Sequence, residues 1–443
     1  MTESAAGRGW FGGVRQEPDV GLPPDAIVAA YRREFAGLAL EHAPVALRPI
    51  VVTQGAYREL LQATESLLRL LARAAHEVGP DRAARARVLS VTDQDCPVFG
   101  DDEDFEQRHW ADMARADVVV GPQGPMFVEF NVSGTFEGLL DFHALLETWQ
   151  RVREAAGRPA YVAVDPFPGF AGLVRRVCAE LEVPPELLFV GTRRMWGSDV
   201  SRRYYLRKTA LLRRHGVHAE QVEFADLSAR PGLARRVAVF DFTAADGRAE
   251  GFDLSPVWQA VRAGMRLVPS QSAWFLHSKK LLALLSEGMD WMDARQRELV
   301  DRYVPWSRVL GERKVLWAGR HHDLPRLLAE QQHQMVIKHA TGDAGRQVTF
   351  GARTAPADWR RLVERACASG DHVAQQVVSS VPYPVEVIGP DGQVTRVRAD
   401  AVVSPFCIGG SASGCHAKFV THGEPGVISI SQGAVSSCLV AES

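Results

Sequence analysis

A hairpin pattern near residue 123 constrains the fold of this chain more than any other feature of its sequence. Residues 115–131 read RADVVVGPQGPMFVEFN, in which two runs rich in Val, Met and Phe flank Gly-Pro-Gln-Gly-Pro. Such runs on either side of a turn rich in glycine and proline are typical of two adjacent antiparallel strands. The pattern therefore predicts a β-hairpin.

Polar side chains interrupt this hairpin at alternate positions. Because side chains alternate between the two faces of a strand, Arg115 shares a face with Asp117, and Glu129 shares one with Asn131. Strand pairing can then gather a cation, two carboxylates and an amide on one patch. Such oxygen ligands suit Mg²⁺, which usually takes phosphate oxygens as its remaining ligands. The alternative is an edge hairpin with a solvated polar face, and the hairpin alone does not decide between the two.

Composition and charge narrow the class of protein. A chain of 443 residues is long enough for roughly two or three domains. Its 51 basic and 53 acidic residues give a net charge of −2, which favours neither nucleic acid nor an anionic membrane as a partner. The N-terminus lacks the apolar core of a signal peptide, and no apolar run reaches the roughly 18 residues of a membrane span. With six cysteines and no C-x-x-C pair, we expect reduced thiols in a cytoplasmic protein, and no zinc site.

The apolar periodicity changes along the chain. It predicts helices over 25–44 and 54–78, a strand at 88–93, a helix over 101–115 and another that begins near Thr135. From 158 to 245, short apolar runs alternate with helical segments, as in a βαβ layer. The strands expected there are 160–165, 187–191, 221–226 and 236–242. Because G-x-G-x-x-G is absent, we do not expect a nicotinamide site. Nearer the C-terminus, strands are expected at 372–378, 401–410, 416–420 and 426–434.

Two lysines in the second half of the chain are candidates for binding phosphate. A predicted helix over 273–288 carries Lys279, and a predicted strand carries Lys338 into a loop with Gly342 and Gly345. Such a loop can lay backbone N–H groups over phosphates while the ammonium adds charge. It is not a Walker A loop, because G-x-x-x-x-G-K-[ST] is absent. The alternative is an exposed hairpin whose lysine reaches into solvent.

A pair of glutamines, Gln375-Gln376, interrupts the apolar strand at 372–378. Buried amides need hydrogen-bond partners, and the edge of an adenine offers both a donor and an acceptor.

The order of these elements resembles the circularly permuted ATP-grasp ligases of the glutathionylspermidine synthase type. In that family R-x-D, followed by E-x-N, supplies a phosphate-binding Arg and three Mg²⁺ ligands. Arg115-x-Asp117 and Glu129-x-Asn131 match this pattern at the family's spacing. The family's S-N-K-A-x-L-x-x-L helix resembles HSKKLLALL, which puts Lys279 at the position of its lysine.

Further motifs follow in the order that the family shows. IKHATGDAGRQV resembles K-P-x-x-G-R-E-G-A-N-V in Lys338, Gly342 and Gly345. The glutamine of the family's adenine hinge corresponds to Gln375, or to Gln376 if the register shifts by one.

The last match departs from the family in one residue. The family's G-x-x-x-R loop is similar to Gly414-Cys-His-Ala-Lys418, with lysine in place of arginine. Lys418 would bring a point charge to a phosphate rather than a bidentate fork. His339 likewise replaces the family's proline.

The resemblance implies an α/β (α+β) fold, namely a circularly permuted ATP-grasp fold with a Rossmann-like pre-ATP-grasp domain. The expected divisions are a flexible N-terminal arm (1–24), the first part of the ATP-grasp domain with the metal-binding hairpin (25–157), the Rossmann-like domain (158–268), the lid subdomain with the nucleotide lysines (269–370) and the rest of the ATP-grasp domain (371–443).

The resemblance also implies roles for the matched residues. Asp117, Glu129 and Asn131 would hold one or two Mg²⁺ ions. Arg115 and Lys418 would be catalytic and stabilise the transferred phosphoryl group, and Lys279 and Lys338 would bind the ATP phosphates. Gly342 and Gly345 would belong to a lid loop. Gln375 or Gln376 would contact the adenine.

The implied reaction is ATP-dependent amide or peptide bond formation between a carboxylate and an amine, through an acyl phosphate, with release of ADP and phosphate. The expected partners are small molecules, such as an amino acid or short peptide, in the biosynthesis of specialised metabolites. A small-molecule kinase on the same scaffold and a non-catalytic nucleotide-binding protein are the alternatives. The sequence leaves the oligomeric state open and allows a homodimer.

Two smaller features stay open at this stage. The acidic run 101–104 has the charge to attract an amine substrate, but it also has the composition of a solvated helix start. His416 is a candidate base for the amine, or a structural residue.

Overall fold

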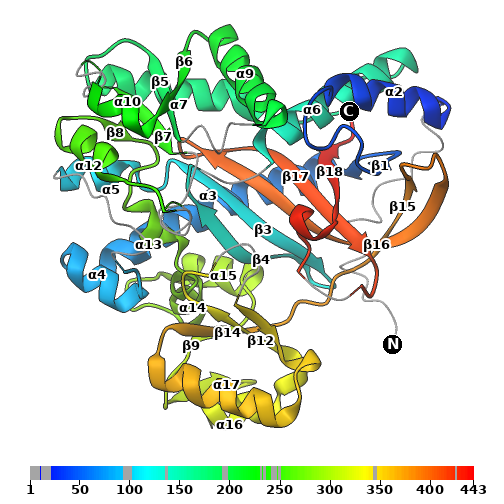
Figure 1. Ribbon diagram of the computed structural model, residues 1–443. Coiled ribbons are helices and arrows are strands. Elements are labelled where there is room, and N and C mark those ends of the chain that lie inside the picture. The colour runs from blue at the N-terminus through cyan, green and yellow to red at the C-terminus, as the bar shows by residue number, and fades with distance from the viewer. Residues whose placement is uncertain are drawn as a thin grey trace.

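The computed structural model describes residues 10, 21–92, 102–134, 138–191, 198–229, 232, 236–240, 247, 251–342, 347–424 and 427–443. Most of the predicted N-terminal arm lies outside these residues, as do Asp101, Thr135 and Gly345. The fold is mixed α/β, as predicted (Figure 1).

The centre of the structure is an eight-stranded sheet. Its order is β1-β15-β16-β17-β18-β2, and β16 also pairs with β3, which pairs with β4. The strands are β1 (Val45–Ala46), β2 (Ile50–Val52), β3 (Met113–Gly121), β4 (Gly124–Val132), β15 (Tyr383–Ile388), β16 (Val394–Ile408), β17 (Ser411–Thr421) and β18 (Val435–Ala441). All pairs are antiparallel except β18 with β2. Strands from the first and last thirds of the chain therefore lie side by side, cyan against orange in Figure 1.

Helices cover both faces of this sheet. On one face α3 packs over alternate residues of the strands, such as Ala114, Ala116 and Val118 of β3. The helices on this side are α3 (Gln54–Glu77), α13 (Ala273–His277), α14 (Lys280–Glu287) and α15 (Ala294–Tyr303). The other face is covered over β16–β18 by α2 (Pro24–Glu34), α6 (Leu139–Ala155) and α7 (Pro166–Glu180). On β3 and β4 this second face carries the polar side chains of the hairpin.

A second sheet is parallel and has the order β6-β5-β7-β8. Its elements are β5 (Glu186–Gly191), β6 (His218–Glu223), β7 (Val237–Phe240) and β8 (Arg266–Leu267), with α7 and α9 (Asp199–Arg214) on one side and α10 (Phe224–Ala229) and α12 (Ser255–Arg262) on the other. The loop after β4 meets the carboxyl end of β7, because a Cβ added at Gly134 would lie 3.2 Å from the carbonyl oxygen of Phe240. In open α/β sheets ligands bind outside the carboxyl ends of the strands.

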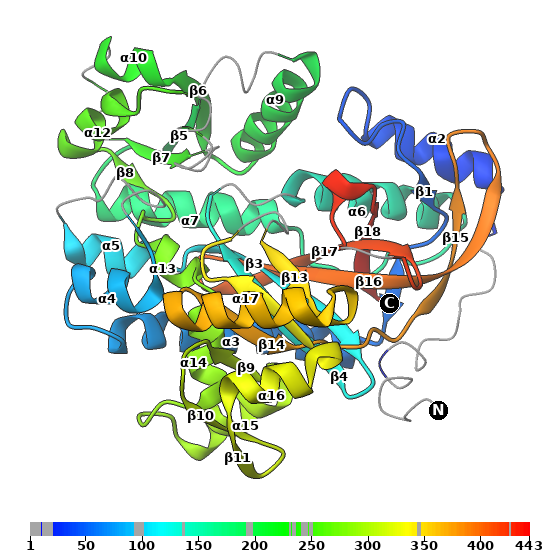
Figure 2. The ribbon, with the colours of Figure 1, turned by 60° about the horizontal axis from the view of Figure 1, so that its bottom comes forward.

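The third sheet is antiparallel, with the order β13-β12-β14-β9. We call it the lid sheet; it consists of β9 (Ser307–Val309), β12 (Met335–His339), β13 (Val348–Phe350) and β14 (His372–Gln376). Helices α16 (Leu324–Glu330) and α17 (Pro356–Ser369) cover one of its faces around Trp359 (Figure 2). The opposite face bears Lys338 and Gln375, which reach β4. The hairpin β10 (Lys314–Trp317)–β11 (Arg320–Asp323) lies beside it.

Several predicted elements are wrong. The described part of the segment 88–93, residues 88–92, is no strand, because α4 (Arg82–Leu89) runs into it and is capped by Ser90, whose φ is 54°. Of 160–165 only Val162 pairs, in a single bridge to Ala441, and Val162 and Val164 are exposed rather than buried as a core strand requires. In the segment 426–434 the described residues lie outside any strand and include a 3₁₀ turn at Ile430–Gln432.

Two predicted helices end early and a third is interrupted. The helix over 25–44 is α2, which ends at Glu34. The helix over 101–115 is α5 (Glu103–His109), and the chain has entered β3 by Met113. The helix over 273–288 breaks between α13 and α14, at Ser278 and Lys279. No described helix is both long and apolar enough to cross a membrane. The five cysteines within the described residues are free thiols.

The predicted phosphate loop at Gly414–Lys418 is instead the middle of strand β17. A register shift between Pro405 and Phe406 of β16 makes Gly414 the extra residue of a bulge. Its φ of +59° suits glycine, and an added Cβ would lie 2.5 Å from Cε1 of Phe142 on α6. Gly414 therefore allows α6 to pack closely on the sheet.

We expect Gly414→Ala to lower the free energy of unfolding by roughly 3 kcal/mol, the sum of a left-handed alanine and an overpacked core. The matched control is Gly410→Ala, where φ is +85° and no atom lies within 4 Å of the added Cβ. It should cost only about 1 kcal/mol. Urea unfolding of both variants measures the difference, and equal losses would contradict close packing at Gly414.

Candidate active site

The four polar side chains of the hairpin share one face of the sheet. Register pairs Arg115 with Asn131 and Asp117 with Glu129. Immediately beyond, the register shifts, so that Val128 is an extra residue on β4. Such a bulge leaves a backbone carbonyl free to accept bonds from outside the ladder. The two carboxylates thus face each other across the hairpin, as the alternation predicted.

Asp117 is surrounded by cations and by one hydroxyl. Its carboxylate accepts a hydrogen bond of 2.8 Å from Ser404, and it lies 3.4 Å from Nε of Arg115 and 3.8 Å from Nζ of Lys418. Burial alone would raise the pKa of Asp117, but the charges of Lys418 and then Arg115 outweigh burial, and the pKa lies well below its ordinary value. Asp117 is therefore ionised at neutral pH.

Glu129 is paired from a different part of the chain. Nζ of Lys279 lies 3.1 Å from its carboxylate. Burial raises the pKa of Glu129, but Lys279 and then Lys338 more than offset that effect, so the pKa is lowered. Both carboxylates are thus held as anions by buried cations.

The break between α13 and α14 positions Lys279. Lys279 is the N-cap residue of α14, and its backbone N–H donates to the carbonyl of Ala340 at 2.9 Å. Its ammonium group donates to the carbonyl of Gly342. A lysine in the middle of a continuous helix would not have its own N–H available for this contact. Because of the break, Lys279 contacts the loop after β12 through both its backbone and its side chain, while its ammonium group also lies next to Glu129.

Lys338 approaches the same patch from the lid sheet. Its ammonium group donates to the side-chain oxygen of Gln375 at 2.8 Å and to the bulged carbonyl of Val128 at 3.2 Å. Burial lowers the pKa of Lys338 to about 8, against the opposing charge of Glu129. Gln376 does not join this group; its backbone N–H donates to the carbonyl of Trp306.

His416 is a poor candidate for the base. It is buried, its Nε2 lies 2.9 Å from the hydroxyl of Ser436, and its Nδ1 has no hydrogen-bond partner among the described residues. Burial, and then the charges of Lys418 and Arg115, lower the pKa of His416 to about 3. A group so weakly basic does not take a proton from an ammonium at neutral pH.

Two residues of the acidic run make structural contacts. Asp102 accepts a hydrogen bond from the backbone of Phe105 at the start of α5, and Glu103 pairs with Arg82 and Arg85. These contacts favour the interpretation as a helix start.

The donor set at the hairpin fits a hard divalent cation. Asp117 and Glu129 supply carboxylate oxygens on facing strands, and the amide nitrogen of Asn131 is buried with no partner among the described residues. The oxygen of this amide is of the kind that can serve as a third ligand. No three His, Cys, Asp or Glu side chains gather into a metal site within the described ranges. A cation here would therefore need oxygens from a bound ligand as well.

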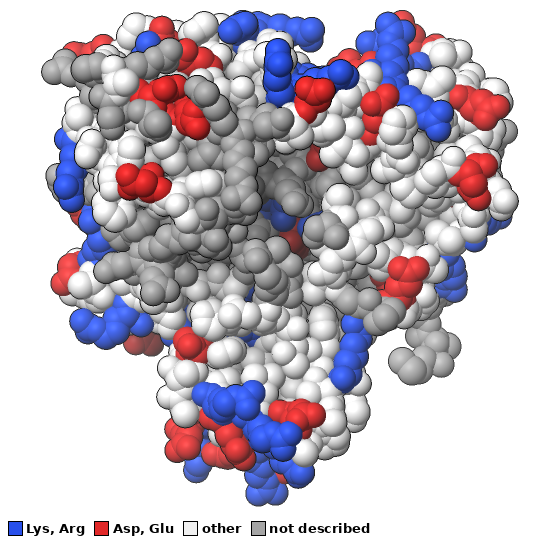
Figure 3. Space-filling view, viewed as in Figure 1, with Lys and Arg blue, Asp and Glu red and all other residues white. Residues whose placement is uncertain are grey.

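The space-filling view shows that one face of the molecule is hollowed. On the face in Figure 3 the surface is hollowed near its centre, and both basic and acidic atoms are visible inside the hollow.

Sequence reasoning missed two contributors. Ser404 on β16 lies beside Asp117 on β3, because the register pairs Val403 with Val118 and Phe406 with Arg115, on either side of the two residues. A serine inside an apolar run was the available signal. The carbonyl of Val128 had none, because a bulge leaves no mark in side-chain composition. Gly345, predicted for the lid loop, lies outside the described residues.

Comparison with solved structures supports the fold. The chain is similar to a glutathione synthetase-like effector from Globodera pallida in its apo form, with a TM-score of 0.58 and 12% identity over 96% of this chain and 99% of that one. A putative gamma-glutamylcysteine synthetase from Methylobacillus flagellatus KT aligns over 85% of this chain and 88% of its own, at 12% identity and a TM-score of 0.42. No protein-family profile and no curated protein sequence matches the chain. At such identity the first likeness establishes a shared fold, and the second is too distant to add to it.

The buried imidazole predicts a pH effect on stability. In the unfolded chain His416 gains a proton below about pH 6.5, whereas the folded protein resists protonation down to about pH 3. Stability is therefore lost as pH falls between these values, by about 2 kcal/mol from this residue between pH 7.5 and 5. Replacing His416 by Gln should remove that part of the loss.

Urea unfolding of the wild type and His416→Gln at both pH values tests this expectation. An equal decrease in the two proteins would contradict a neutral buried His416.

Proposed function

We propose that this protein is an ATP-dependent carboxylate–amine ligase with a circularly permuted ATP-grasp fold. It would join a small carboxylic acid to an amine as an amide or peptide bond, as in the biosynthesis of specialised metabolites. The observation that carries the proposal is the arrangement of Asp117 and Glu129, which face each other and are neutralised by buried lysines from separate elements.

The connectivity supports the permutation. The metal-binding hairpin comes early, at β3–β4, yet it pairs with β16, which follows the lid sheet in the chain. In the usual ATP-grasp order the metal ligands come after the nucleotide lysines. One sheet assembled from the first and last thirds of the chain is what a permuted order requires.

The charge pattern supports a nucleotide triphosphate as the ligand. Lys279 and Lys338 reach the carboxylates from α14 and from the lid sheet, and Arg115 and Lys418 reach them from the central sheet. When ATP is absent these cations pair with Asp117 and Glu129. When ATP binds, phosphate oxygens would take over the cations, and the freed carboxylate oxygens would turn to the metal.

Asp117, Glu129 and Asn131 would hold one or two Mg²⁺ ions, which supply positive charge to the β- and γ-phosphates. Arg115 and Lys418 would stabilise the transferred phosphoryl group, and Lys279 and Lys338 would bind the remaining phosphates. The acid would attack the γ-phosphorus to give an acyl phosphate and ADP, and the amine would then displace phosphate. The loop that begins at Gly342 would exclude water from that intermediate.

The site for the acid and amine would lie between the hairpin and the parallel sheet. The loop after β4 touches the carboxyl end of β7 at Gly134, which is the edge where open α/β sheets bind ligands.

A screen for ADP release tests the function. Amino acids and other small acids are paired with amines in the presence of ATP and Mg²⁺, and the wild type should release ADP and phosphate fastest when both are present. An acid labelled with ¹⁸O in its carboxylate should then transfer one label to the phosphate. A phosphorylated product without amide would instead identify a kinase, and no nucleotide turnover with any pair would contradict both.

Glu129→Gln should reduce this turnover by a factor of roughly 100 or more, because the neutral amide would hold the metal more weakly than the negatively charged carboxylate does. Its melting temperature should fall, because Lys279 and Lys338 both lose the negative charge that they face, while circular dichroism should show that the variant still folds. Near-normal ADP release by the variant would place the metal elsewhere.

A further inference from the structure

The side chain of Gln375 has no free hydrogen-bond donor with which to contact an adenine. Its side-chain oxygen accepts from Lys338, and its nitrogen donates to the hydroxyl of Ser307 at 3.1 Å and to the carbonyl of Val128 at 3.3 Å. An amide nitrogen has two hydrogens, so both donors are used. The donors that would recognise a base are therefore occupied inside the protein, and the oxygen already accepts from a buried ammonium group.

The orientation of this amide is fixed by its neighbours. Lys338 can only donate, and the carbonyl of Val128 can only accept. The hydroxyl of Ser307 donates to the carbonyl of Pro305 at 2.9 Å, so it must accept from Gln375. Oxygen toward Lys338 and nitrogen toward Ser307 is thus the orientation that satisfies all three neighbours.

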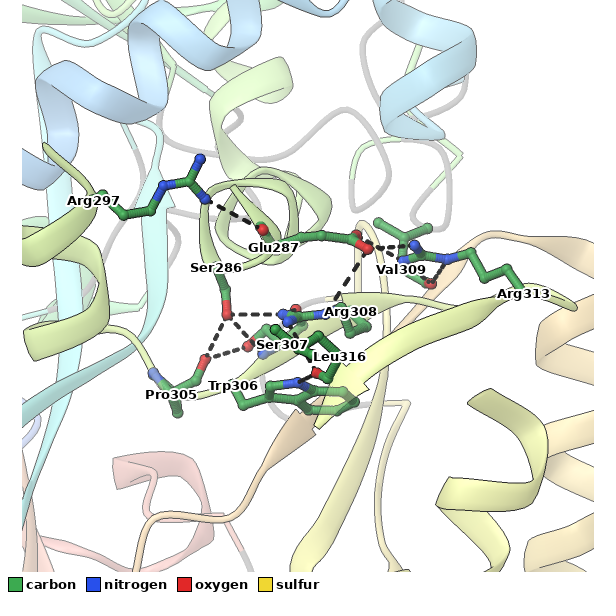
Figure 4. A network of polar contacts seen from close by, with 10 residues as sticks. All are labelled: Ser286, Glu287, Arg297, Pro305, Trp306, Ser307, Arg308, Val309, Arg313 and Leu316. Carbon is green, nitrogen blue, oxygen red and sulfur yellow. Dashed lines mark hydrogen bonds and ion pairs between the residues drawn. The ribbon is translucent and has the colours of Figure 1, made fainter. Parts of the chain in front are cut away.

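Ser307 is itself held in place by the end of α14 (Figure 4). Its backbone N–H donates to the hydroxyl of Ser286 at 3.0 Å, and that hydroxyl also accepts from Arg308 at 3.3 Å. Nearby, Glu287 accepts two hydrogen bonds from Arg313. Gln375 therefore links Lys338 to the hydrogen-bond network that contains Ser307 and Ser286.

We propose that Gln375 is a positioning residue for Lys338, and that it does not read the nucleotide base. With the bulged carbonyl of Val128 it holds the ammonium on the side of β4 where Asp117 and Glu129 lie. Glu129, Asp117 and Lys279 are the charged groups that act on Lys338 there. This inference rests on the proposed ATP site, and it adds a residue that positions the ammonium group of one of the lysines in that site.

The neighbouring glutamine offers a matched control. Gln375 is buried, whereas Gln376 is half-buried and points to the other face of the strand, because β14 side chains alternate. The two residues have the same chemistry and adjoin each other, so they separate a role in positioning from a general effect on β14.

The test is a double-mutant cycle on ATP affinity, measured by calorimetry with Mg²⁺ present. Gln375→Met should weaken ATP binding roughly tenfold, as expected for the loss of a hydrogen bond to a charged group. In a Lys338→Met background the same change should weaken binding by no more than about twofold, because Gln375 acts through the lysine. Full additivity of the two losses would overturn the proposal.

A second nucleotide distinguishes positioning from base recognition. Gln375→Met should weaken ATP and GTP by the same factor, so that their ratio of affinities is unchanged. A selective loss of ATP would show that Gln375 reads adenine and would contradict the proposal.

The controls separate this inference from the proposed function. Gln376→Met should leave the contribution of Lys338 intact, so Lys338→Met should cost the same in its presence. Ser307→Ala, which keeps the lysine contact, should weaken ATP binding less than Gln375→Met and gives a milder variant if the latter unfolds. If the wild type itself binds no ATP, the proposed function fails; if it binds ATP and Gln375→Met binds equally well, only the role of Gln375 fails.

Discussion

Charge neutralisation of two facing carboxylates is the interaction on which the rest of this site depends. Asp117 and Glu129 are fixed opposite each other by the register of β3 and β4, and without cations their mutual repulsion and burial would favour protonation. Lys418 and Lys279 prevent this from two sides. The price is that both lysines must also be buried, so removal of either partner would leave an unpaired charge.

The architecture brings these groups together from distant parts of the chain. Lys418 lies on β17 of the central sheet, Lys279 at a break between two helices, and Lys338 on the lid sheet. Gly414, four residues before Lys418 on the same strand, lets Phe142 of α6 pack closely on the sheet. The carboxyl edge of the parallel sheet adjoins the loop after β4.

Local patterns allowed part of this to be predicted. Alternation along a strand was enough to place Arg115 and Asp117 on one face and to pair them with Glu129 and Asn131, because the two strands are joined by a short turn. The same logic failed where tertiary context decides. The run at 160–165 is apolar, yet Val162 and Val164 are exposed and make no sheet. The break before Lys279 was hidden in a continuous helical pattern.

Other features could not be predicted because they depend on the register between distant strands. Ser404 meets Asp117 only because β16 pairs with β3, and Val128 offers its carbonyl only because β4 bulges there. For Gln375 the sequence showed a buried amide that needs partners, and the structure supplies those partners within the protein. A resemblance in motif order thus located the residue, while its contacts changed the interpretation of its role.

The central claim is that Asp117 and Glu129 bind the metal of a metal–ATP complex. The most direct measurement is a titration with Mn²⁺ in place of Mg²⁺, with free Mn²⁺ followed by electron paramagnetic resonance in the presence and absence of ATP. The account predicts that the wild type binds one or two Mn²⁺ ions with ATP, and that the double variant Asp117→Asn, Glu129→Gln loses this binding while it remains folded. The same Mn²⁺ binding in both proteins would contradict the account.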